Sequence, residues 1–242
     1  MFFRPFFHDD SGCAAYVLGC GGLAQCAVVD AHEQDIQSYS DFASSKGMRI
    51  THVIDTHVHA DHRSGGRALA DQVGAAYCLH ESADVNVPFQ KLRDGEEIAL
   101  GNTRIQVLHT PGHTPEGISL VVTDLRRGAD PWFVLTGDTL FVGAVGRPDL
   151  PGNARQCAVQ LYDSIHTKLL TLPGGLEVYP AHFAGSACGV GISGKPSTTL
   201  AFELRWNPML SMAKDEFVEA LSDVPPKPVG MDAILQANRG RA

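Results

Sequence analysis

The stretch that decides the fold of this chain is Thr56-His57-Val58-His59-Ala60-Asp61-His62. It holds three imidazoles and one carboxylate within six residues, a density that no packing requirement explains. Imidazole nitrogens combined with carboxylate oxygens suit zinc, iron or manganese, whereas a calcium site is built mostly from oxygen. Residues two apart in an extended turn point the same way, so His57 and His59 can reach one ion while Asp61 and His62 face the neighbouring space. The stretch therefore predicts a metal site.

Three further candidate ligands share the local context of this stretch. Residues 56–62 follow an apolar segment, and His113, Asp138 and His182 each come shortly after another one. In layered α/β folds, functional groups gather beyond the carboxyl ends of the strands. Four such ends at one edge of the fold would bring these side chains together. We therefore expect one active site with seven members: His57, His59, Asp61, His62, His113, Asp138 and His182.

Short apolar segments that alternate with helical periodicities predict a mixed α/β fold. Strands are expected at residues 14–18, 27–29, 50–54, 76–79, 104–108, 118–122, 132–135 and 176–179. Helices are expected at 34–45, 66–72, 158–170 and 209–221. No repeat or linker divides the chain, so we expect one domain over residues 1–242.

Composition and charge narrow the classes of partner. The chain is 44% hydrophobic and 19% charged, which is ordinary for a globular protein. Its net charge of -8 argues against nucleic-acid binding, which rests on neutralising phosphates with Lys and Arg. No stretch approaches the roughly 20 apolar residues of a membrane span, and the six cysteines show no CxxC spacing. We expect a cytoplasmic protein with reduced thiols that acts on small molecules.

The motifs resemble those of the metallo-β-lactamase superfamily. Residues 56–62 match its signature, followed by Thr-Pro-Gly-His-Thr-Pro around His113 and Thr-Gly-Asp-Thr-Leu-Phe around Asp138. The resemblance runs from about Cys13 to Ala187. It implies an α/β fold of four layers, the αβ/βα sandwich, with two central sheets and helices outside.

Other stretches narrow the resemblance to a subfamily. Gly-Asp-Thr-Leu-Phe-Val-Gly-Ala-Val-Gly-Arg-Pro-Asp at 137–149, Val-Tyr-Pro-Ala-His at 178–182 and Ala-Gly-Ser-Ala-Cys-Gly at 184–189 are similar to persulfide dioxygenases, also called sulfur dioxygenases. More narrowly, they are similar to the bacterial kind that is often fused to a rhodanese domain. We expect no rhodanese domain in this chain, so that a rhodanese-type sulfurtransferase partner would be a separate protein. Several relatives pair as dimers, which makes a homodimer an expectation here.

The resemblance also implies roles for the site residues. It implies one Fe(II) per chain held by His57, His113 and Asp138, a face of two histidines and one carboxylate that leaves positions open for dioxygen and a substrate sulfur. The remaining four, His59, Asp61, His62 and His182, would orient the ligands and hold water. The implied reaction oxidises glutathione persulfide, or a related small persulfide, with O2 to sulfite and a thiol.

Two other uses of the same residues stay open from the sequence. A glyoxalase II-like thioester hydrolase would hold two zinc ions that share Asp138, with His182 as a direct ligand. A non-catalytic scaffold or sensor would keep a metal for stability, although structural sites usually close with four ligands and rarely have surplus imidazoles and carboxylates beside them.

Three residues near the motifs bear on substrate binding. Arg147 could hold a substrate carboxylate as a planar fork, or tie its own loop internally. Cys188 follows His182 in a Gly- and Ser-rich turn and is either a thiol that binds the substrate or a structural cysteine. Phe183 stands where relatives usually have glycine, and its bulk is expected to reshape substrate access.

Overall fold

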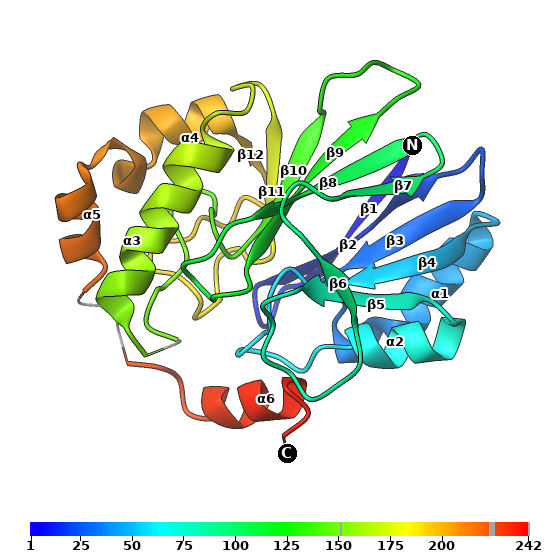
Figure 1. The fold of residues 1–242 in the computed structure, drawn as a ribbon, viewed down its shortest axis with the longest axis horizontal. Helices are drawn as coiled ribbons and strands as arrows, with labels where there is room; N and C mark the ends of the chain where they lie inside the picture. Colours follow the sequence, from blue (N-terminus) through cyan, green and yellow to red (C-terminus); the bar gives the residue numbers. More distant parts are fainter. Residues whose placement is uncertain (151, 223–225, 242) are drawn as a thin grey trace.

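Two six-stranded sheets lie at the centre of the fold, with helices on their outer sides (Figure 1). The structure, a computed structural model, describes residues 1–150, 152–222 and 226–241. The layers are those of the four-layer sandwich that the motifs imply.

The first sheet has the strand order β1-β2-β3-β4-β5-β6. Its strands are β1 Phe2–His8, β2 Cys13–Cys20, β3 Gln25–Val29, β4 Arg49–Ile54, β5 Ala76–His80 and β6 Gln90–Leu92. Strands β3 to β6 pair in parallel, which requires crossover connections. Helices α1 (Ile36–Ser45) and α2 (Gly66–Val73) supply two of them. Strands β3 and β4 therefore end at the same edge, where Asp30 and the histidine-rich stretch follow.

The second sheet has the order β12-β11-β10-β9-β8-β7. Its strands are β7 Glu97–Leu100, β8 Thr103–His109, β9 Ile118–Asp124, β10 Phe133–Gly137, β11 Glu177–Pro180 and β12 Thr198–Thr199. Strand β9 runs antiparallel to both β8 and β10, and β10 runs parallel to β11. Strands β8, β10 and β11 thus share one direction, and the loops after them carry His113, Asp138 and His182.

Three helices cover the outer face of the second sheet, and a fourth lies below the loops that join the two halves (Figure 1). The covering helices are α3 Ala154–Ser164, extended by a π-helical turn Ile165–Leu169, α4 Leu200–Trp206 and α5 Lys214–Ala220. Short 3-10 turns occupy Glu33–Asp35 and Pro208–Ser211. The last helix, α6 Met231–Asn238, returns the chain toward the first half of the molecule.

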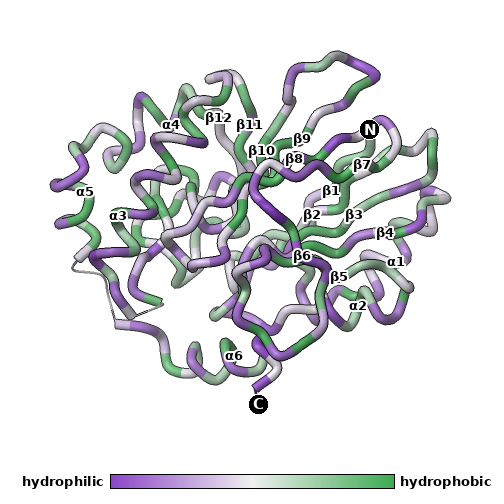
Figure 2. Tube along the Cα trace, viewed as in Figure 1, coloured by the Kyte–Doolittle hydropathy of each residue, from purple (hydrophilic) through white to green (hydrophobic). Residues whose placement is uncertain are grey.

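Strand β2 shows how the sequence builds the layers. Ala14, Tyr16 and Leu18 belong to the apolar cluster between the two sheets, whereas Ala15 and Val17 belong to the cluster under α1 and α2. This is the alternation of a strand whose two faces are both covered. Hydrophobic colour accordingly follows the central strands, and hydrophilic colour follows many of the peripheral loops (Figure 2).

The eight predicted strands all coincide with observed ones, whereas one predicted helix is wrong. The helix expected at 209–221 is broken, because Met212 and Ala213 are extended and α5 begins only at Lys214. The carboxylate of Glu216 accepts a hydrogen bond from the backbone N–H of Ala213, which starts a new helix there. Strands β1, β6, β7 and β12 and helices α4 and α6 were not predicted.

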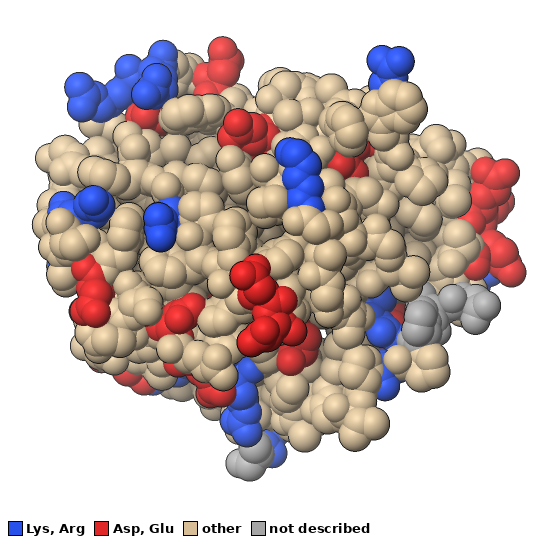
Figure 3. Space-filling model, turned by 180° about the vertical axis from the view of Figure 1, so that it is seen from behind, with Lys and Arg blue, Asp and Glu red and all other residues tan. Residues whose placement is uncertain are grey.

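No helix among the described residues is long and apolar enough to cross a membrane. On the face turned away from the view of Figure 1, Lys and Arg side chains are scattered and interrupted by Asp and Glu (Figure 3). On this face the basic side chains form no continuous patch.

We expect Tyr16→Phe to lower the free energy of unfolding by about 1 to 2 kcal/mol. The buried Tyr16 hydroxyl donates a 2.6 Å hydrogen bond to the carbonyl of Pro180, which connects the two sheets. Urea denaturation of the two proteins measures the difference. Tyr162→Phe is the control, because its hydroxyl has no hydrogen-bond partner among the described residues, and it should leave the midpoint nearly unchanged. Equal midpoints for Tyr16→Phe and the parent would show that the hydrogen bond from Tyr16 to Pro180 does not stabilise the fold.

Candidate metal centre

The structure gathers all seven predicted residues at one edge of the two sheets. Six of them are buried, and the side chain of Asp61 is 10% exposed. The potential ligand atoms of His57, His113 and Asp138 lie within 4.8 Å of one another, and a second such group contains Asp61, His62 and His182. The two groups meet through the side chain of Asp138, which contacts His182.

Both histidines of the first group are oriented through Nδ1. His113 Nδ1 donates to the carbonyl of Arg147 at 2.8 Å. The hydroxyl of Thr56 donates to Asp30, so its oxygen accepts the bond from His57 Nδ1 at 3.0 Å. Each ring therefore has its proton on Nδ1 and a lone pair on Nε2.

These lone pairs converge on a carboxylate oxygen. Oδ2 of Asp138 lies 3.2 Å from His113 Nε2 and 3.7 Å from His57 Nε2. All three atoms are buried without a hydrogen-bond partner among the described residues. Three acceptors that face one another in a buried site repel unless a cation lies between them. The donor set fits a divalent transition metal, which would satisfy all three.

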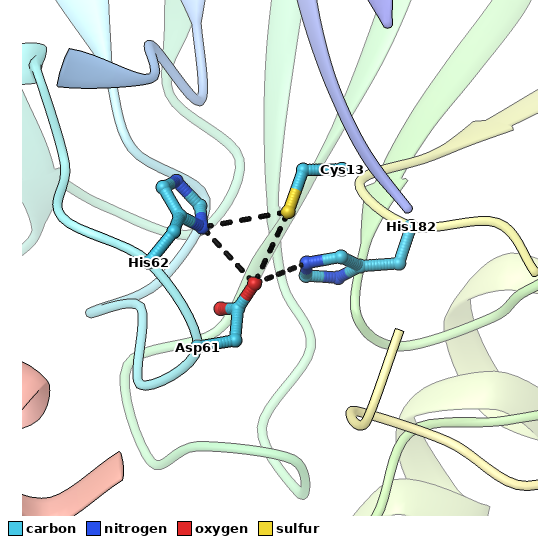
Figure 4. Close-up of side chains that lie close together, drawn as sticks. All are labelled: Cys13, Asp61, His62 and His182. Carbon is cyan, nitrogen blue, oxygen red and sulfur yellow. Dashed lines mark hydrogen bonds and ion pairs between the residues drawn. The ribbon is translucent and has the colours of Figure 1, made fainter. Parts of the chain in front are cut away.

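The second group is joined by hydrogen bonds (Figure 4). His182 donates from Nδ1 to Asp138 at 2.6 Å and from Nε2 to Asp61 Oδ2 at 2.8 Å. The same Asp61 oxygen accepts bonds from His62 Nδ1 at 3.1 Å and from the thiol of Cys13 at 3.2 Å. His182 thus connects the two carboxylates, and Asp61 Oδ2 is the centre to which three donors point.

The environments of these side chains separate their pKa values. Burial lowers the pKa of His57 to about 3 and that of His59 to about 4, so both rings are neutral at pH 7 and suited to binding a metal. Burial also opposes charge on His62 and His182, but the adjacent carboxylates outweigh it. The pKa of His62 is raised to about 10, and that of His182 well above its ordinary value. The neighbouring histidines hold the pKa of Asp138 below its ordinary value against the effect of burial.

Asp30 was not predicted from the sequence, and it binds the histidine-rich stretch through hydrogen bonds. Its carboxylate accepts bonds from the backbone N–H of Thr56 at 2.7 Å, the Thr56 hydroxyl at 3.0 Å and His59 Nε2 at 3.2 Å. Asp30 adopts a left-handed backbone conformation with φ of 54°, which is strained for a residue with a side chain. A signal was present, because Asp30 directly follows a predicted apolar strand, as the metal-site residues do.

Cys13 and Glu116 were also missed. Cys13 begins β2, where a two-residue antiparallel bridge to His182 brings it beside Asp61, and no local pattern marks it. Burial raises the pKa of its thiol. Hydrogen bonds with His182 and His62 lower the same pKa by more, so it lies below its ordinary value. Glu116 is buried and accepts a bond from the backbone N–H of Val58 at 2.9 Å.

The three residues predicted to affect the substrate lie close to the centre. The Arg147 fork binds both oxygens of Asp149, at 2.7 and 2.9 Å, which is the internal tie considered above. Cys188 is buried, and its sulfur lies within 4.8 Å of ligand atoms of Asp138 and His182. Phe183 points into the apolar cluster between the sheets and packs edge-on against Phe7, so its bulk lies largely within the core.

Fold and site together define a metal-binding αβ/βα sandwich, and sequence comparison agrees. The profile of the metallo-beta-lactamase superfamily matches residues 10–182, so the chain belongs to that superfamily. The fold class implied by the motifs is thereby confirmed, and a metal cofactor is supported by the His and Asp groups described above.

Among the relatives are persulfide dioxygenases. The chain is 28% identical to "Persulfide dioxygenase ETHE1, mitochondrial" of Bos taurus over 97% of this chain and 86% of that protein. A crystal structure of ETHE1 from Myxococcus xanthus has a TM-score of 0.86 at 33% identity and covers 99% of this chain and 98% of that one. A hydroxyacylglutathione hydrolase of Anaeromyxobacter dehalogenans is 34% identical over 69% of this chain and 60% of that protein. The predicted likeness to persulfide dioxygenases is confirmed.

We expect the metal-free protein at pH 7 to hold His59 neutral and His62 protonated. The pKa of His59 is lowered to about 4, because the folded protein favours the neutral ring. The stability that neutral His59 contributes is therefore complete above pH 6.5 and is lost as pH falls toward 4. The pKa of His62 is raised to about 10, so its contribution is complete below pH 6.5 and is lost as pH rises toward 10. Imidazole ¹⁵N shifts measure both states. Two rings that titrate together near pH 6.5 would contradict the described environments.

Proposed function

We propose that this chain is a persulfide dioxygenase that uses one Fe(II), held by His57, His113 and Asp138. The observation that carries the proposal is the convergence of two imidazole lone pairs and one carboxylate oxygen, buried and unpartnered, within 4.8 Å. A face of two histidines and one carboxylate is typical of non-haem Fe(II) oxygenases. The likeness of the whole chain to ETHE1 persulfide dioxygenases supports this proposal.

His182 favours one metal over two in this proposal. Both of its ring nitrogens lie within hydrogen-bond distance of carboxylate oxygens, so a second ion at this ring would have to displace the bond to Asp61. The bond to Asp138 also occupies Oδ1, which leaves Oδ2 as the oxygen that faces His57 and His113. His182 and Asp61 thereby orient the carboxylate of the ligand set.

In the proposed reaction, a persulfide RSSH, O2 and water give RSH, sulfite and two protons. Bound iron would supply O2 activation and a position for the terminal sulfur, which takes both oxygen atoms before hydrolysis releases the thiol. The chain provides two imidazoles and one carboxylate in a buried setting that limits water. Glutathione persulfide is the proposed substrate.

We also propose that Cys188 contributes to the substrate site. Its sulfur is buried beside Asp138 and His182, on the loop that follows His182. Burial raises the pKa of the thiol well above its ordinary value, so the group is a neutral thiol beside the carboxylates. The guanidinium of Arg147, paired with Asp149, could contact a substrate carboxylate only by rearranging that pair.

A glyoxalase II-like hydrolase is the second candidate, favoured by a different observation. His59 Nδ1, Asp61 Oδ1 and His62 Nε2 are also buried without hydrogen-bond partners among the described residues. A second zinc ion could use such atoms if His182 released Asp61. The likeness to a hydroxyacylglutathione hydrolase supports this alternative.

A sulfurtransferase partner follows from the proposed dioxygenase reaction. A separate rhodanese-type sulfurtransferase would exchange sulfur with the substrate or product, and a homodimer is the proposed assembly. Residues 1–242 are proposed to act as one domain in the cytoplasm.

Oxygen consumption by anaerobically iron-loaded protein tests the proposal. With glutathione persulfide we expect O2 uptake, and sulfite in equal amount, because both oxygen atoms of each O2 go to one sulfur. Metal analysis should give about one iron per chain. His57→Ala is the matched control and should lose bound iron and O2 uptake together. No uptake by the iron-loaded protein would refute the dioxygenase, and about two zinc ions per chain with thioester hydrolysis would support the hydrolase.

Cys188→Ser should lower turnover with glutathione persulfide if the thiol contacts the substrate. The serine hydroxyl preserves the shape of the side chain but not the polarisable sulfur. Turnover and the sulfite-to-thiol ratio measure the effect. Cys157→Ser, a buried thiol on α3, is the control and should leave both unchanged. Unchanged turnover and products in Cys188→Ser would remove Cys188 from the substrate site.

A further inference from the structure

The C-terminal helix α6 ends against the histidine-rich stretch. The side-chain amide of Asn238 donates one hydrogen bond to the carbonyl of His59 and one to the carbonyl of His62, each 2.8 Å long. Its Oδ1 accepts the backbone N–H of Ser64 at 3.1 Å. One carboxamide thus joins three backbone groups of the turn that carries the site histidines.

This arrangement uses the full donor capacity of the amide. A carboxamide has two N–H donors, and both are directed at the turn. The turn between β4 and α2 has no regular secondary structure. The carbonyls of Thr56 and Arg63 accept bonds from the backbone N–H groups of Ile118 and Glu33, whereas those of His59 and His62 accept the two bonds from Asn238. Asn238 therefore provides the hydrogen bonds that a sheet or helix would otherwise supply, and it does so from a helix more than 170 residues away in sequence.

Further contacts hold α6 in place. Met231 is buried in an apolar cluster with Ala60, Phe141 and Cys188, and Leu235 packs against that cluster. Beyond the helix, the carbonyl of Arg239 accepts a bond from the backbone N–H of Asn86 at 2.8 Å. Helix α6 is therefore held by contacts with both halves of the chain, and it lies below the connecting loops (Figure 1). It also lies outside residues 10–182, which match the superfamily.

We propose that Asn238 is a positioning residue for the metal centre, and that α6 completes the site by fixing the turn from His59 to Ser64. The amide sets the path of the backbone between the ligand His57 and the Asp61–His62 pair. The inference concerns metal binding and is independent of which reaction the centre performs.

Metal affinity tests the proposal, with Asn238→Ala and Asn238→Asp as variants. Removing a group that orients metal ligands typically lowers the metal affinity 10- to 100-fold. We expect a loss of Zn²⁺ affinity in that range for both variants. Asn238→Asp keeps the size and the acceptor but replaces two donors with an oxygen that faces two carbonyls. Competition with a chromophoric chelator, using Zn²⁺ as the probe, measures the affinity without any assay of turnover. Parental affinity in Asn238→Asp would overturn the proposal.

Two controls separate positioning from a general loss of stability. Gln236→Ala changes an exposed residue of the same helix and should bind Zn²⁺ as the parent does. Asn153→Ala removes the side chain that caps α3, so it destabilises the fold at a distance from the turn. It should lower the midpoint of unfolding without changing the affinity. If Asn153→Ala and Asn238→Ala lose affinity equally, the effect is stability alone and the proposal fails.

Hydrogen exchange of the parent protein gives a test that needs no variant to fold. The Ser64 amide should be protected, because its acceptor is the Asn238 side chain. Exchange of Ser64 at the rate of an exposed amide would overturn the proposal. Failure of the proposed dioxygenase reaction would leave each of these measurements unchanged, so the two outcomes are distinguishable.

Discussion

The carboxylate of Asp138 is the group on which the rest of the site depends. It is buried and keeps its charge because His182 donates to one oxygen, while the other faces the Nε2 atoms of His57 and His113. A buried charge without such partners would be expensive and would take up a proton instead. The histidines therefore hold Asp138 ionised, and Asp138 in turn requires a cation opposite its second oxygen.

This requirement explains much of the surrounding hydrogen bonding. Thr56 and the carbonyl of Arg147 each accept an Nδ1 proton, so both imidazoles present a lone pair to the same point. The carboxylate of Asp30 accepts hydrogen bonds from the backbone N–H and the hydroxyl of Thr56, and the backbone of Asp30 is strained. Strain of this kind persists only where the surrounding structure compensates for it. The fold holds these groups in place by ending strands of both sheets at one edge.

The two halves of the site differ in what they can do. The side near His57 presents open acceptors, as expected of ligands that leave room for substrates. The side near His182 is closed by hydrogen bonds among Asp61, His62 and Cys13, which favours orientation over direct binding. The seven residues thus fit the proposed one-metal oxygenase, and they would fit a two-metal hydrolase if the His182 ring released Asp61.

The sequence by itself determined the class of fold, the eight principal strands and the seven residues of the candidate centre, because local periodicity and composition mark them. Only the tertiary structure showed that His182 bridges two carboxylates, that Cys13 and Asp30 join the site, and that Asn238 reaches the turn from the C-terminus. Each depends on a partner or on a backbone path that neighbouring residues do not specify, since hydrogen bonds between distant segments form only when the layers have assembled.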